Sequence, residues 1–186
     1  MVLNEKLSLK NRIHFTVLVI LFVWLNLIWD YFHTGVPTHH ILQREDLPGV
    51  SNWWGGLAVP LISWFLLIRI AKRVNIKMAI SNIYNPSIYT FLGSLFFGII
   101  LSFFFTISSN ITGYMMIGLI FLSFFIQLYK AEFLLGFIIG MTYTFGGILP
   151  IAIGSLLIIL FTINYKLVRY GVLYILSKVG LRKDNN

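Results

Sequence analysis

The sequence predicts an all-α, polytopic membrane protein, a bundle of six transmembrane helices. The chain of 186 residues is 58% hydrophobic and 11% charged, whereas about a quarter of the residues in soluble domains are charged. Its mean hydropathy is +0.86. Apolar runs long enough to cross about 30 Å of hydrocarbon recur along the chain, separated by turn signals. We therefore expect residues 1–186 to form a single transmembrane helical domain.

Six apolar runs are the expected spans. The last two are kept separate because one helix over residues 131–165 would be too long for the bilayer. Gly146-Gly147 followed by Pro150 is also a strong turn signal. The expected spans cover residues 13–29, 53–68, 86–107, 111–129, 131–147 and 149–165.

Polar and small residues indicate what lies between and along these runs. Gly35 and Pro37 end the first helix. Thr38 suits the N-cap of a short helix within the outer polar segment, residues 30–52. Two further segments are basic and amphipathic, which is typical of chain lying on a membrane surface. They are residues 70–85 and the tail 166–186. Within the third span, a stripe of small residues is typical of a helix contact: Gly93, Ser94 and Gly98.

The distribution of positive charge predicts the orientation. In a six-span chain, 13 of the 14 Lys and Arg residues fall on one side, and Arg44 on the other. Cytoplasmic loops carry such an excess, so we expect both termini in the cytoplasm and segment 30–52 outside. The net charge of +8 is then a topology signal that also attracts anionic lipids. Membrane lipids, not nucleic acid, are the expected partners. Compact loops favour a bacterial inner membrane, and a homo-oligomer is an open alternative.

The reactive side chains gather between Asp30 and Gly56, a stretch with three of the four histidines and three of the six acids. Zinc is commonly held by His nitrogen and carboxylate oxygen, and bound zinc activates water. The sequence therefore suggests a metal-assisted hydrolase or transferase acting on a lipid-like substrate. The spacing matches no strict zinc motif, so a solvated structural loop is the competing interpretation. The candidate metal ligands are His33, His39 and His40, and the candidate catalytic residues are Asp30, Glu45 and Asp46.

Residues around this stretch are candidates for binding the substrate. Asn26 lies about one turn before Asp30, on the same helical face as His33. The SNWWGG element fits either an interfacial anchor or an aromatic pocket wall with close backbone approach. Tyr143 is expected near the outer side. The candidate substrate-binding residues are Asn26, Ser51, Asn52, Trp53, Trp54 and Tyr143.

Ionisable residues are missing from the middle of the expected spans. Lys130 and Glu132 stand at the start of the fifth and are expected to reach water. The lack of ionisable residues there argues against proton-coupled transport and voltage sensing as functions of this chain. A transporter or channel subunit remains an alternative because Pro60 and the Gly146–Pro150 break interrupt the helices. A non-catalytic membrane assembly protein is another. With no cysteine, disulfides and Cys-ligated metals are excluded.

Overall fold

The structure is a computed structural model that describes residues 8–33, 35–40, 49–80, 87–107 and 110–183. Its described part is helical except for one two-stranded sheet and short turns. In chain order the elements are α1 (Leu9–His33), β1 (Thr38–His40), β2 (Gly49–Ser51), α2 (Trp53–Ile80), α3 (Ser87–Thr106), α4 (Ile111–Leu122), α5 (Ala131–Phe145), α6 (Ile148–Ile163), the π-helical segment η2 (Asn164–Val168) and α7 (Arg169–Lys183).

Four helices are long and apolar enough to cross a membrane, as expected for a polytopic membrane protein. These candidate spans are Leu9–His33, Trp53–Ile76, Ser87–Thr106 and Ile148–Ile175. The apolar helices α4 and α5 have 12 and 15 residues, fewer than the roughly 20 that a crossing helix needs. The nearly all-helical class and the presence of membrane-compatible helices are therefore confirmed. That the chain crosses the membrane six times stays a prediction.

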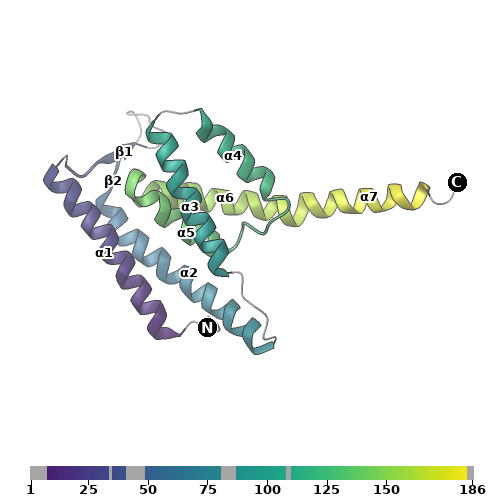
Figure 1. Ribbon diagram of the computed structural model, residues 1–186, viewed down its shortest axis with the longest axis horizontal. Coiled ribbons are helices and arrows are strands. Elements are labelled where there is room, and N and C mark those ends of the chain that lie inside the picture. The colour runs from purple at the N-terminus through teal and green to yellow at the C-terminus, as the bar shows by residue number, and fades with distance from the viewer. Residues whose placement is uncertain (1–7, 34, 41–48, 81–86, 108–109, 184–186) are drawn as a thin grey trace.

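Helices α1 and α2 lie side by side, and α4 lies on the opposite side of α3 from them (Figure 1). Helix α5 lies at the centre, where it contacts α2, α3 and α6. Helix α6 runs on into α7, which projects from the bundle as a rod (Figure 1). We call the end of the bundle near β1 and β2 the strand end, and the opposite end of α2 the basic end.

The core is built around α5. Its residues from Glu132 to Ile138 are all buried, as expected for a helix that is apolar on every side. One side of α5 joins a cluster with α1 and α2, and the other a cluster with α3, α4 and α6. Helix α1 contributes only a narrow stripe of buried residues, Val19, Val23 and Leu27, and its other faces are exposed.

Small residues bring α3 and α5 into backbone contact. A Cβ atom added to Gly136 or Gly140 would collide with the backbone of α3, and one added to Gly98 would lie 3.0 Å from the Phe137 carbonyl oxygen. Close approach of this kind is the usual role of small residues between membrane helices. Of the predicted stripe, Ser94 and Gly98 are buried in this contact, whereas a Cβ atom added to Gly93 would meet nothing within 4 Å outside its own turns of helix.

Helix α2 is longer than the expected span 53–68. It continues to Ile80 because Ile70, Ala71 and Val74 are buried against the bundle. The prediction of a separate surface segment from residue 70 was therefore wrong over residues 70–80, and residues 81–85 lie outside the described part. Helix α4 is shorter than expected and ends at Leu122, where the Ser123 hydroxyl donates to the Ile120 carbonyl at 2.5 Å.

The predicted helix beginning at Thr38 was also wrong where the structure describes it. Thr38–His40 pair antiparallel with Gly49–Ser51, with His39 opposite Val50. The β-branched Thr38 and Val50 favour a pleated surface, and the Pro37 carbonyl accepts a further bond from the Asn52 amide at 3.0 Å. Residues 41–48 lie outside the described part.

The two-helix prediction for residues 131–165 is confirmed, with the break at Gly146-Gly147. The tail beyond is not a separate segment, because η2 joins α6 to α7 without a break. At this join the Asn164 side-chain amide donates to the Ser123 hydroxyl at 3.0 Å, and the Gln127 amide donates to the Tyr165 hydroxyl at 3.1 Å. These bonds attach the α4–α5 connection to the start of the tail.

Candidate functional site

A groove opens between α1, α3 and α5 in the half of the bundle nearer the strand end. Its larger part has a volume of about 540 Å³, within the range of about 300–1,000 Å³ typical of ligand sites. A smaller hollow of about 220 Å³ shares Phe22 and Tyr143 with it. We name the two together the α1–α3–α5 groove. The larger part is lined by Phe22, Leu95, Ile99, Ser102, Phe103, Thr106, Ile107, Ile139, Gly140, Tyr143 and Thr144.

The walls of this groove are apolar, and its polar atoms are few. The Ser102 side chain is 4% exposed, and its hydroxyl has no hydrogen-bond partner within the described part of the chain. Thr106 donates its hydroxyl to the Ser102 carbonyl at 2.9 Å. Tyr143 is 69% exposed and Thr144 is also exposed. An apolar channel with a few hydroxyls fits a molecule with a long apolar part and a small polar group.

Two of the predicted substrate-binding residues meet at the groove. Asn26 of α1 and Tyr143 of α5 both line the smaller hollow, together with Trp29. They are far apart in sequence, and α1 and α5 bring them together. Asp30 and His33 follow Asn26 by one and two turns on α1, so the groove leads toward the end of that helix.

His33 is held in a defined position at the end of α1. Its ring stacks on Trp29 with centroids 3.8 Å apart and planes 18° apart. Its Nδ1 lies 2.9 Å from the Trp29 carbonyl oxygen. A carbonyl can only accept, so Nδ1 is the donor in this bond, and the neutral ring has Nε2 as its lone-pair nitrogen. Nε2 is therefore the ring nitrogen that a metal would take.

The predicted metal site is not complete within the described residues, where no group of three or more His, Asp or Glu side chains converges. The backbones of His39 and His40 pair with Val50 and Gly49, and the structure does not describe their side chains. Glu45 and Asp46 lie outside the described part. Convergence of these residues on Asp30 and His33 therefore stays a prediction.

Asn52 contacts the α5–α6 break and not the groove. Its side chain is 5% exposed and its Oδ1 accepts a hydrogen bond from the Gly147 amide at 3.0 Å. Its carbonyl accepts from the Gly55 amide at 2.8 Å in the first turn of α2. Gly146 has a φ of +69°, and any Cβ there would collide with the Asn52 amide group. The SN…GG residues thus join the start of α2 to the turn between α5 and α6.

The other residues of this element lie on the surface. The Ser51 hydroxyl is 3.5 Å from the Trp53 amide, a long hydrogen bond. The Trp53 ring lies 6.2 Å from those of Trp24 and Tyr31, which makes an exposed aromatic cluster. Trp54 lines a separate apolar hollow of about 340 Å³ between β2, α2 and α6. Exposed tryptophans of this kind are typical of interfacial anchors.

Comparisons with protein-family models, with curated proteins and with solved structures found no match to this chain. The groove and the side chains at its ends are therefore the basis for a functional assignment. The Asn26–Tyr143 pair was accessible to sequence reasoning through its polarity. Thr144 stands beside Tyr143 near the outer side, where the sequence also allowed it to line the cavity. Ser102 and Thr106 were not distinguishable from hydroxyl residues that hydrogen-bond between helices.

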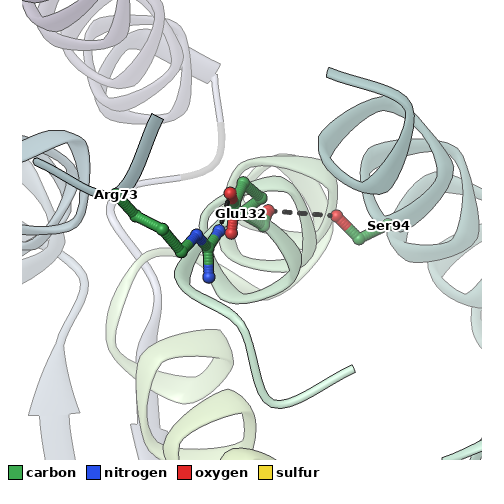
Figure 2. Close-up of polar contacts among 3 residues, drawn as sticks. All are labelled: Arg73, Ser94 and Glu132. Atoms are coloured by element: carbon green, nitrogen blue, oxygen red, sulfur yellow. Dashed lines mark hydrogen bonds and ion pairs between the residues drawn. The ribbon is translucent and has the colours of Figure 1, made fainter. Parts of the chain in front are cut away.

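An ion pair at the basic end was missed by sequence reasoning. Glu132 is 1% exposed, so the expectation that it reaches water was wrong. Its carboxylate meets the guanidinium of Arg73, and the Ser94 hydroxyl lies 3.4 Å from its carbonyl oxygen (Figure 2). The pair exists because α2 is long enough to carry Arg73 to the first turn of α5. The basic residues after residue 68 were the sequence signal for a partner to Glu132, but we interpreted them as part of a surface segment.

Proposed function

We propose that the protein binds a lipid-like molecule in the α1–α3–α5 groove, with the polar group of that molecule toward Asp30 and His33. The observation that carries this proposal is the groove itself, an apolar channel of about 540 Å³ that continues past Tyr143 to Asn26 and Trp29. Two of its walls, α1 and α3, are helices long and apolar enough to cross a membrane, so a lipid can enter it sideways from the bilayer.

The proposal includes a six-crossing topology in a bacterial inner membrane, with both termini in the cytoplasm. The asymmetry of Lys and Arg along the chain supports it. In that orientation the strand end, with the groove and His33, faces outward. The short helix α5 would cross inside the bundle, because it is covered by protein and not by lipid. The short helix α4 would cross at the edge of the bundle, with one face toward lipid.

The chemistry that we propose at the strand end is metal-assisted hydrolysis or group transfer on the bound lipid. His33 supplies a positioned ring whose Nε2 carries the lone pair, and Asp30 stands one turn before it on the same helix. His39 and His40, with Glu45 and Asp46, would supply the further ligands or the general base for water. This part of the proposal is tested separately from lipid binding.

Retention of lipid through detergent exchange tests the binding proposal. Native mass spectrometry of the purified chain should show one retained lipid per protein. Thr144→Trp places an indole in the groove from an exposed position, and should remove most of that lipid. The matched control, Leu156→Trp, changes a residue of α6 that is 68% exposed and does not line the groove; it should retain lipid as the wild type does. Equal retention in both variants would contradict the proposal.

Metal content tests the catalytic part. We expect about one zinc or similar divalent ion per chain, lost in His39→Ala and His40→Ala, together with any lipid turnover. His14→Ala is the control because His14 lies near the opposite end of α1. Absence of stoichiometric metal with unchanged turnover would remove the metal from the proposal and leave lipid binding standing.

The structure offers less support for a transporter than for a lipid-binding protein. The break at Gly146–Pro150 was, together with Pro60, the sequence feature behind that alternative. In the structure it is closed by Gly55, whose backbone packs against Gly147, and by the side chain of Asn52. A break filled in this way is a packed joint and not a polar cavity.

A further inference from the structure

We propose a second site at the basic end, a groove between α2 and the start of α5 that binds the phosphate of an anionic molecule. The groove has a volume of about 570 Å³, and of its described lining residues four are cationic and none is acidic. We call it the basic groove. It is lined by Arg69, Lys72, Arg73, Ile76, Tyr129, Lys130 and Ala131.

Most of its charge comes from one face of α2. Arg69, Lys72, Arg73 and Ile76 follow the spacing i, i+3, i+4, i+7, so their side chains project on the same side of the helix. Like charges three or four residues apart repel one another. Positive charge that serves only to set the topology has no need to gather on a single face. An anion between these side chains would turn the repulsion into attraction.

The buried carboxylate of Glu132 fixes one of these cations. One terminal nitrogen of Arg73 meets Glu132, and the Arg73 side chain is still 33% exposed (Figure 2). A guanidinium has five N–H donors, so this pair leaves others for a ligand. Arg73 therefore lies at the base of the basic groove in a set position, which reduces the entropy lost when a phosphate binds.

The opposite wall adds further positive potential and an apolar surface. Lys130 stands at the N-cap of α5 and Ala131 begins the helix, whose dipole favours an anion at that end. The Tyr129 ring has the Lys166 ammonium 5.2 Å from its centre. Ile76 is 51% exposed. A cationic groove with an apolar edge matches a phosphate attached to a glycerol or acyl group.

Two sources can supply this chemistry, a phospholipid headgroup and a soluble phosphate ester. Titrations of the full chain in a neutral detergent distinguish them. The probes are dioctanoyl phosphatidylglycerol, the zwitterionic dioctanoyl phosphatidylcholine and glycerol 3-phosphate. We expect saturable binding of the anionic lipid, and much weaker binding of the choline lipid because its cation meets the basic cluster. Comparable binding of glycerol 3-phosphate would assign the site to soluble phosphates, and binding of the lipid alone to membrane headgroups.

Two double variants with the same change in net charge distinguish specific phosphate binding in the basic groove from general attraction of anions to a positively charged protein. Arg69→Gln with Lys72→Gln removes two exposed cations of the basic groove without touching the Arg73–Glu132 pair. We expect the affinity for the anionic probe to fall about tenfold or more, because two charge-assisted hydrogen bonds to the phosphate are lost. Arg69→Lys with Lys72→Arg should restore most of it.

The control is Arg169→Gln with Lys178→Gln on α7, outside the basic groove. It should change the affinity less than about twofold, because screened charges away from the bound anion contribute little. Unchanged gel-filtration profiles establish that both double variants fold. Equal losses in the two, or no saturable binding of either phosphate probe, would overturn the proposal. Thr144→Trp should leave this binding unchanged, so the outcome is independent of the α1–α3–α5 groove.

Discussion

Asn52 and Glu132 show how single buried polar residues hold this apolar chain in register. Each is almost fully buried, and each makes its contact with another element. A buried polar group without a partner is costly, so such pairs specify which helices meet and where. Asn52 determines how α2 meets the α5–α6 turn at the strand end, and Glu132 how α2 meets α5 at the basic end.

Replacing Asn52 should destabilise the protein more than its small size suggests. Asn52→Ala leaves the buried Gly147 amide without its acceptor, at a cost of about 1–3 kcal/mol. Thermal unfolding in detergent should show a lower midpoint. Ser51→Ala is the control because the Ser51 hydroxyl makes only a 3.5 Å contact at a part-exposed position. A similar midpoint for the two variants would mean that the Asn52 bond contributes nothing.

The Arg73–Glu132 pair should show strong coupling. Arg73→Gln leaves the buried Glu132 carboxylate without a charge partner, and removing one member of a buried pair costs about 3–5 kcal/mol. The partial exposure of Arg73 places the expected loss near the lower figure. The double variant Arg73→Gln with Glu132→Gln should recover part of the loss in unfolding measurements. Additive effects in this cycle would show that the two side chains do not interact.

At the scale of elements, the contact between α3 and α5 depends on glycine. Gly136 and Gly140 of α5 face backbone atoms of α3, whereas a Cβ atom added to Gly113 or Gly118 of α4 would meet nothing within 4 Å outside its own turns of helix. Gly140→Ala should force the helices apart and lower the unfolding midpoint. Gly118→Ala should be neutral or slightly stabilising, because alanine favours the helix by about 1 kcal/mol over glycine. The reverse order would contradict the packing described above.

The sequence predicted the helices better than their ends. Hydropathy located every apolar run, and Gly146-Gly147 located the break in the last two. The ends of α2 and α4 were misplaced because tertiary contacts decide them. Burial of Ile70 and Val74 extends α2 beyond its hydropathic limit. The chain just after α4 is tied to the start of the tail by the bonds of Ser123 with Asn164 and of Gln127 with Tyr165. These two hydrogen bonds join residues 41 and 38 positions apart, which a local pattern does not contain.

The candidate site was predictable only in part for the same reason. Polarity singled out Asn26 and Tyr143, and the structure places both along one groove. Asn52 was singled out by the same property, yet it holds the α5–α6 turn. Nothing in the local sequence distinguishes a polar residue that lines a groove from one that joins two helices. The groove itself results from the way that α1, α3 and α5 pack.

For the whole molecule, the charge distribution makes the proposed orientation testable. The chain has no cysteine, so single cysteines can be introduced without a background. Thr38→Cys at the strand end should react with a membrane-impermeant maleimide added outside intact cells. Lys178→Cys on α7 should react only after the cells are opened. The opposite pattern would reverse the topology, and labelling of both positions from outside would exclude an even number of crossings.

Cross-linking with a photoactivatable phospholipid tests lipid binding in the α1–α3–α5 groove most directly. The chain is reconstituted with a lipid that carries a diazirine in its acyl chain, illuminated and mapped by peptide mass spectrometry. The groove residues of α3 and α5, within 95–107 and 139–144, should be labelled several-fold more than the exposed face of α4 at Tyr114, Ile117 and Phe121. Thr144→Trp should abolish the excess. Even labelling of all lipid-facing helices, unaffected by Thr144→Trp, would contradict the existence of a lipid site in this groove.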